Sequence, residues 1–152
     1  MTFASPLVRL KVSDHRRILA HCYHELPNEG CGLLIGAAIG GEDVDDGEPT
    51  GAISDVITAR NDAASARLYV VHGQDYGAAR KAARAAGMKV VGCFHSHTHT
   101  DPYPSPTDID AAKNNPGWIY VIVSLRDDVP TLRAFRVLDG VVAECQVVLE
   151  AG

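Results

Sequence analysis

Two histidines and an aspartate in the second half of the chain have the spacing of a metal site. One residue separates His95 from His97, and Asp108 follows after a proline-bearing segment. Side chains two apart on a β-strand project from the same face, so both imidazoles can point toward one ion. A carboxylate at the start of the next helix can complete three ligands and leave a fourth position for water. These residues therefore predict one Zn²⁺ per chain, with a catalytic water.

The same residues also have structural explanations. Two histidines on a strand are commonly polar surface residues, and Ser105 with Asp108 forms a capping-box pattern at a helix start. The capping interpretation is compatible with a metal site, because a fixed helix start would hold the Asp108 carboxylate in place. The joint spacing, with a suitable glutamate upstream, favours the metal.

That glutamate is Glu29, which lies between the first predicted helix and a buried apolar strand. A carboxylate near zinc-bound water can take its proton, since zinc lowers the pKa of that water to about 7. We therefore predict that Glu29 is the general base of a hydrolase.

Hydrophobic periodicity and turn residues indicate the elements that position these groups. Residues 1–152 are expected to form one α/β domain with a mixed, largely antiparallel sheet flanked by helices. Asp139-Gly140 indicates a type I′ hairpin turn, Ser13 a helix N-cap and Gly87 a helix end. Strands are expected at residues 7–12, 31–39, 52–58, 68–71, 88–97, 118–124, 131–138 and 141–149, and helices at 14–26, 76–86 and 106–113.

Composition narrows the class of protein. The net charge is −5, but five acidic residues lie within residues 42–48, and the rest of the chain has equal numbers of acidic and basic residues. We interpret this acidic segment as a solvated connection, and without a basic stripe we expect no nucleic-acid partner. No segment resembles a membrane span or an export signal, and the four cysteines lack C-x-x-C spacing. We therefore expect a cytoplasmic protein with reduced thiols and no membrane contact.

The set formed by Glu29, His95, His97, Ser105 and Asp108 resembles the motif of the JAMM, or MPN-plus, metalloproteases. The resemblance runs from the P-x-E-x-C-G-L-L segment to the final strands. The H-S-H-T, Y-P-S and V-I-V-S sequences are similar to those of small bacterial members that release cysteine from the C-terminus of a ubiquitin-like sulfur-carrier protein.

This resemblance implies a JAMM/MPN-like fold of the cytidine-deaminase-like type and a hydrolase partnered by a ubiquitin-like sulfur carrier with a Gly-Gly C-terminus. It implies that Ser105 donates a hydrogen bond to the oxyanion formed when hydroxide attacks the last glycine of the carrier. The short segment between Asp108 and Trp118 leaves no room for the insertion that grips polyubiquitin, so a ubiquitin chain is not the expected substrate. Two alternatives stay open: a peptidase or isopeptidase with another small-protein or peptide substrate, and a non-catalytic MPN scaffold. The oligomeric state is open too, a homodimer included.

Other residues that could do chemistry have simpler interpretations. His99 is expected in the loop after the strand, as a surface residue or a neighbour of the ligands rather than a third ligand. His21, His24 and Glu25 are interpreted as a solvated helix face, since no H-E-x-x-H pattern is present. Cys31 is expected to pack in the core, because an apolar strand raises the pKa of a thiol and disfavours a nucleophile.

Overall fold

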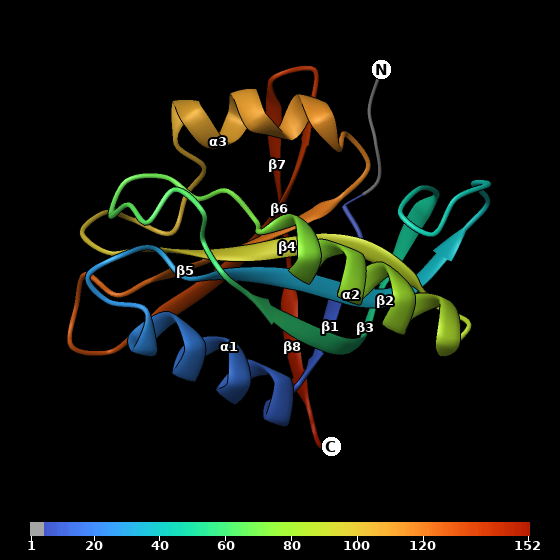
Figure 1. Ribbon diagram of the computed structural model, residues 1–152, viewed down its shortest axis with the longest axis horizontal. Helices are drawn as coiled ribbons and strands as arrows, with labels where there is room; N and C mark the ends of the chain where they lie inside the picture. The colour runs from blue at the N-terminus through green and yellow to red at the C-terminus, as the bar shows by residue number, and fades with distance from the viewer. Residues whose placement is uncertain (1–4) are drawn as a thin grey trace.

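A computed structural model describes residues 5–152 as one mixed sheet with helices on both faces (Figure 1). The strand order across the sheet is β7-β6-β5-β4-β2-β3-β1-β8. Along the chain the elements are β1 (Val8–Lys11), α1 (Val12–His24), β2 (Cys31–Ile39), β3 (Glu48–Ala59), α2 (Gly73–Ala85), β4 (Lys89–His97), α3 (Pro106–Ala111), the 3₁₀ turn η1 (Ala112–Asn114), β5 (Ile119–Ser124), β6 (Thr131–Leu138), β7 (Val141–Cys145) and β8 (Val147–Glu150).

Antiparallel pairs dominate the sheet, as expected. Strand β2 runs antiparallel to both β3 and β4, and β5, β6 and β7 form an antiparallel meander. Strand β4 is parallel to β5, and β1 is parallel to β3 and to β8. Because β4 and β5 are parallel, the chain between them must cross back over the sheet, and α3 and η1 lie in that crossover.

Helix α1 covers one face of the sheet. Its residues Ile18 and Cys22 recur at helical spacing and pack with Leu34 of β2 and Phe94 of β4 in one fully buried cluster. This spacing is the one that predicted the helix.

Helix α2 covers the opposite face. Ala79 and Ala83 pack there with Leu33 and Cys93, the neighbours in sequence of the residues that face α1. Neighbouring residues on β2 and β4 therefore face opposite helices, which explains why both strands are apolar almost throughout. All four cysteines of the chain are buried and unpaired, as expected.

Several predicted boundaries are wrong at the ends of elements. Helix α1 starts at Val12 with Lys11 as its N-cap and no side-chain cap bond, so Ser13 is not the cap; the helix ends at His24, before the expected residue 26. Helix α2 starts at Gly73 rather than residue 76, while Gly87, at φ +67°, follows the helix end as expected. The turn at Asp139-Gly140 is confirmed, because both residues have positive φ.

Two predicted strands are wrong in a more informative way. Residues 68–71 form no strand, and only an isolated bridge joins Asn61 to Val71. The Asn61 side chain takes the place of a strand partner: its amide donates to the Leu68 carbonyl and its oxygen accepts from the Val70 N–H. The expected strand 141–149 is divided at Gln146, where the chain leaves β6 and pairs as β8 with the free side of β1.

The acidic side chains of residues 42–48 are mostly exposed, as the solvated interpretation expected, but several of them also form ion pairs. Asp43 and Asp45 pair with Arg80 of α2, and Asp46 pairs with Lys89 at the start of β4. Within residues 5–152, each helix is too short or too polar to cross a membrane.

Candidate metal centre

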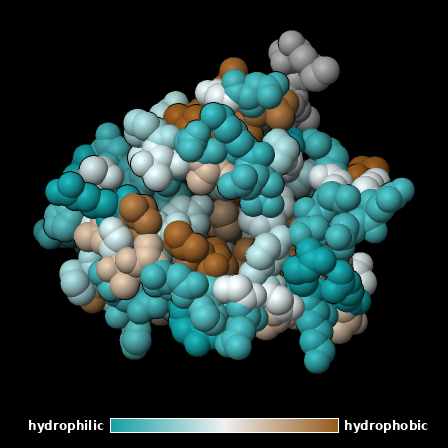
Figure 2. Space-filling model, turned by 45° about the horizontal axis from the view of Figure 1, so that its top comes forward, coloured by the Kyte–Doolittle hydropathy of each residue, from teal (hydrophilic) through white to brown (hydrophobic). Residues whose placement is uncertain are grey.

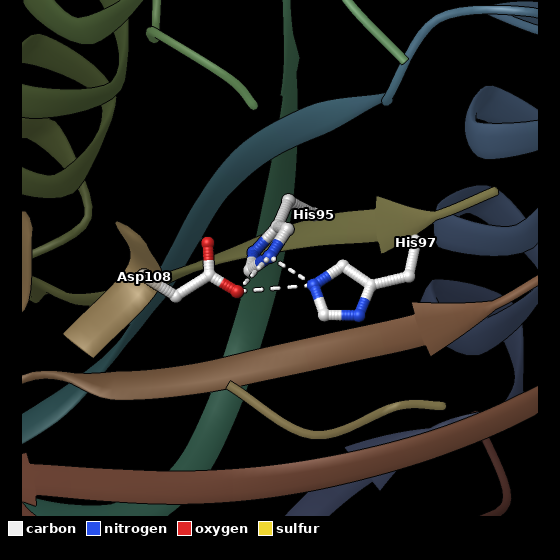
Figure 3. Close-up of side chains that lie close together, drawn as sticks. All are labelled: His95, His97 and Asp108. Carbon is white, nitrogen blue, oxygen red and sulfur yellow. Dashed lines mark hydrogen bonds and ion pairs between the residues drawn. The ribbon is translucent and has the colours of Figure 1, made fainter. Parts of the chain in front are cut away.

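The three predicted ligands converge at the C-terminal end of β4 (Figure 3). His95 Nε2 lies 3.2 Å from His97 Nε2 and 3.1 Å from Asp108 Oδ2, and the third side of the triangle, from His97 Nε2 to Asp108 Oδ2, is 3.0 Å. Zinc bonds of 2.0–2.1 Å at tetrahedral angles separate neighbouring ligand atoms by about 3.3 Å. The triangle therefore has nearly the size that one zinc ion requires.

The donor set also fits a cation. His97 Nδ1 lies 2.7 Å from the carbonyl oxygen of Asp101. Because a carbonyl oxygen only accepts hydrogen bonds, Nδ1 carries the proton of the neutral ring, and Nε2 directs its lone pair toward the triangle. Asp108 Oδ2 adds a negative oxygen to the same point. Metal-bound histidines commonly donate their other ring N–H to such a carbonyl. Residues His95, His97 and Asp108 thus suit Zn²⁺ in number, type and spacing.

The local structure explains how the ligands are aimed. On β4, Phe94 and Ser96 face α1, so His95 and His97 face the side of α2 and α3. Asp108 is held by a capping box at the start of α3: its backbone N–H donates to Ser105 Oγ at 3.1 Å, and its Oδ2 accepts the Ser105 N–H at 3.0 Å. The capping box is therefore present, and it is compatible with Asp108 serving as a metal ligand.

Glu29 lies in a cleft beside this triangle. The cleft has a volume of about 640 Å³, and Glu29, His97 and Ser105 are among the residues that line it. The Glu29 side chain is 3% exposed, and its Oε1 has no hydrogen-bond partner in the part of the chain that the structure describes. Burial, together with the nearby Asp108 carboxylate, raises the pKa of Glu29 to about 8 although His97 opposes the shift. A buried carboxyl group that holds its proton this tightly is suited to accept one from water.

Burial and neighbouring groups also shift the pKa values of the predicted ligands Asp108 and His95. Although burial favours the neutral acid, the two facing imidazoles and the Ser105 N–H hold the pKa of Asp108 well below its usual range. Burial lowers the pKa of His95, whose ring stacks on Tyr69 with 4.2 Å between centroids. The site therefore favours an ionised Asp108 beside a neutral His95, which are the forms that bind metal.

The metal-free protein should show the cost of burying Glu29. Its pKa in the folded state lies above the ordinary 4.5, so its contribution to stability is complete below pH 4.5 and is lost as the pH rises to about 8. Replacing Glu29 by Gln removes this loss. The variant should be more stable than the wild type at pH 8, relative to the same comparison at pH 4.5, by on the order of 4 kcal/mol of unfolding free energy. Urea titrations of both metal-free proteins across this range measure the difference, and a pH-independent difference would contradict the assignment.

The backbone at Glu29 and Gly30 is fixed by four hydrogen bonds. The Glu29 N–H donates to the Ser65 carbonyl at 2.8 Å, and its carbonyl accepts from the Asn61 side chain at 3.0 Å. The next N–H, that of Gly30, donates to Ser96 Oγ at 2.8 Å, and the Ser96 N–H donates back to the Gly30 carbonyl at 3.0 Å. Ser96, between the two histidines, thus links the segment of the base to the strand of the ligands.

Replacing Ser96 by Ala is expected to lower kcat about tenfold with unchanged metal content. The variant leaves the buried Gly30 N–H without its acceptor, which costs about 1–3 kcal/mol and loosens Glu29 relative to the ligands. Steady-state kinetics and elemental analysis measure the two effects. The control is Ser54→Ala on β3, which removes a hydroxyl group that donates to the Ile35 carbonyl of β2. Equal kcat for both variants would show that Ser96 does not position the base.

Other residues singled out in the sequence are not members of the triangle, although His99 lines the adjoining cleft. His99 is exposed in the loop after β4, where its Nδ1 lies 2.8 Å from Thr98 Oγ1. His24 is exposed, whereas His21 is half-buried with Nε2 3.0 Å from the Ala59 carbonyl. Cys31 is fully buried, and burial raises the pKa of its thiol to about 12, as expected for a core residue.

Three residues at the site were missed by sequence reasoning. Asn61 and Ser96 hold the Glu29 segment, and Tyr69 packs on His95. The position of Ser96 within H-S-H was a usable signal, since the residue between two ligands must face the opposite side of the strand. Asn61 and Tyr69 lie in an irregular segment, and no periodicity marks them.

Comparison with protein families agrees with the fold and the arrangement of the site. The model for the prokaryotic homologs of the JAB domain matches residues 11–138. The chain therefore belongs to this family, which confirms the JAMM/MPN resemblance and the single-domain α/β fold.

Its relatives include named proteins. The chain is 33% identical over 128 residues to the CysO-cysteine peptidase of Mycobacterium tuberculosis, a match that covers 84% of this chain and 80% of that protein. It is 35% identical over 99 residues to the desampylase of Haloferax volcanii, covering 64% of this chain and 63% of that protein.

Solved structures share the fold. A protein from Desulfitobacterium hafniense has a TM-score of 0.81 and 29% identity, with coverage of 96% of this chain and 94% of that one. A JAB1/MPN domain protein from Archaeoglobus fulgidus has a TM-score of 0.54 and 20% identity, with coverage of 93% and 99%.

Proposed function

We propose that this protein is a zinc-dependent hydrolase that cleaves the amide bond after the C-terminal glycine of a ubiquitin-like sulfur-carrier protein and releases cysteine. The observation that carries the proposal is the triangle of His95, His97 and Asp108 with the buried carboxyl of Glu29 in the adjoining cleft. A non-catalytic scaffold has no use for a buried carboxyl group with an unpartnered oxygen, which is costly to keep.

His95, His97 and Asp108 would hold the ion, and Zn²⁺ in such a site acidifies water and polarises a carbonyl oxygen. Glu29 takes a proton from the attacking water at its carboxylate and passes it to the nitrogen of the leaving amine. Its burial serves this exchange, because an acid with a raised pKa both accepts and releases a proton near neutral pH.

In this proposal Ser105 stabilises the oxyanion. Its hydroxyl oxygen accepts the Asp108 N–H, so the hydroxyl hydrogen is left free to donate into the cleft that Ser105 lines. A preorganised donor aimed at developing charge stabilises the transition state more than the substrate. Ser105 thus serves both the helix cap and the reaction.

The substrate class rests on the relatives. A CysO-cysteine peptidase and a desampylase are both similar to this chain, and we infer that it acts on a small ubiquitin-like protein. Release of cysteine is favoured because the match to the former covers more of both chains. A second candidate, an isopeptidase acting on another ubiquitin-like conjugate, is favoured by the match to the desampylase.

The test is to incubate the zinc-loaded protein with candidate carriers that bear a C-terminal cysteine, and with a lysine-linked conjugate of each carrier, and to weigh the products. We expect the carrier to lose the mass of one cysteine residue. Cleavage of the lysine-linked conjugates alone would establish the second candidate instead.

A further inference from the structure

On the wall of the catalytic cleft, Arg67 is a cation with no ion-pair partner among residues 5–152. It is exposed and lines the cleft together with Glu29, His97 and Ser105. In residues 5–152, Arg67 and Arg16 are the arginines whose guanidinium has no carboxylate within ion-pair distance, and Arg16 lies on α1, outside this cleft. The other arginines pair with acidic residues.

The backbone that carries Arg67 is tied to the site. The Arg67 N–H donates to Ser65 Oγ at 3.0 Å, and the carbonyl of Ser65 accepts the N–H of Glu29 at 2.8 Å. The carbonyl of Ala66 accepts from Thr98 Oγ1 at 3.2 Å, one residue beyond the ligand His97. Arg67 is thus anchored to both the base and the end of β4 although its own segment has no regular structure.

Figure 2 shows apolar side chains around a hollow on the surface of the molecule. This hollow lies between α3 and the segment that leads into α2. Tyr69, Val70, Val71 and Trp118 line this neighbouring hollow, and the side chain of Val70 is 51% exposed. The residues that line the hollow include Asn114 and Asn115 but no charged side chain, whereas the catalytic cleft has Arg67 on its wall. A charged substrate group is therefore favoured in the cleft and disfavoured in the hollow.

The two kinds of substrate differ in charge beside the bond that breaks. When the leaving group is an amino acid, its free α-carboxylate is only two bonds from the scissile nitrogen and must enter the cleft with it. There it comes close to the Asp108 carboxylate, and the guanidinium of Arg67, which lines the same cleft, can offset the repulsion. When the leaving group is a lysine side chain of a protein, no carboxylate lies there.

We propose that Arg67 is a specificity residue that binds the free α-carboxylate of the leaving amino acid. The guanidinium suits this task because it can form two parallel hydrogen bonds to a carboxylate. The inference rests on the proposed hydrolase function, and it commits the site to substrates that end in a free amino-acid carboxylate.

The test compares two substrates that differ by one charge: the carrier extended by cysteine, and the same carrier extended by cysteinamide. The zinc-loaded wild type is expected to cleave the acid with a kcat/KM about tenfold above that of the amide, the effect of a hydrogen bond to a charged group. In Arg67→Ala the ratio should fall to about one through slower cleavage of the acid alone, and Arg67→Lys should restore part of it. Arg16→Ala, the matched control, should keep the wild-type ratio.

Binding gives a second readout that needs no turnover. In a Glu29→Gln background, calorimetric titration should show tighter binding of the acid than of the amide, and added Arg67→Ala should abolish the difference. A wild-type ratio near one, or a ratio that Arg67→Ala leaves unchanged, overturns the role of Arg67 alone. If the wild type cleaves neither substrate, the proposed function fails and this inference fails with it.

Discussion

Replacing Glu29 with glutamine is expected to lower kcat by on the order of a thousandfold while the metal content stays at the wild-type value. The amide has nearly the same size as the carboxyl group and fits the same buried place, but it cannot take a proton from water. Because Glu29 is not part of the metal triangle, the ligands keep their arrangement. Single-turnover kinetics with the carrier substrate and elemental analysis of the same sample measure both quantities.

The matched control is Glu25→Gln, the same substitution at a half-buried glutamate that follows α1. Glu25 lies near His21 and His24 rather than the triangle, so this variant should turn over at the wild-type rate. A Glu29→Gln protein that kept wild-type kcat would show that another group moves the proton. Loss of metal together with activity would show that Glu29 holds the site together instead.

Replacing Asp108 with alanine is expected to remove both the metal and the activity. The change deletes the only anionic member of the triangle and leaves the two imidazoles without the charge that favours a cation. It also breaks the capping box with Ser105, which costs about 0.5–2 kcal/mol of stability. Metal titration and thermal unfolding of the metal-free protein separate the two effects.

Two further variants divide the contributions. Asp108→Asn keeps an oxygen that can accept the Ser105 N–H, so it should lose the metal yet keep most of the stability of the metal-free protein. Asp110→Ala, at an exposed position of the same helix, should change neither property. An Asp108→Ala protein that still bound one zinc ion per chain with wild-type affinity would mean that the ion binds elsewhere.

The ligand triangle was predictable from sequence because its geometry is local. His95 and His97 share a face by strand periodicity alone, and the S-x-x-D pattern fixes Asp108 to the start of a helix whatever the rest of the chain does. Glu29 was singled out by its position before a buried strand and by its match to the family motif, but no local rule brings it to β4.

Features that depend on contacts distant in sequence were not predictable. Asn61 satisfies the backbone of residues 68–70 through its side chain, so a segment with strand-like composition forms no strand. Strand β8 leaves β6 for β1, a pairing that no turn or periodicity signals. The ion pairs of the exposed acidic loop were not predictable because their partners, Arg80 and Lys89, lie far along the chain.

The most direct test of the metal centre is anomalous diffraction at the zinc edge from crystals of protein purified without chelators. The account requires one peak per chain, about 2.0–2.2 Å from His95 Nε2, His97 Nε2 and Asp108 Oδ2, with an open side toward Glu29. A zinc-replete crystal with no peak among these three atoms, or with its peak on other residues, would contradict it.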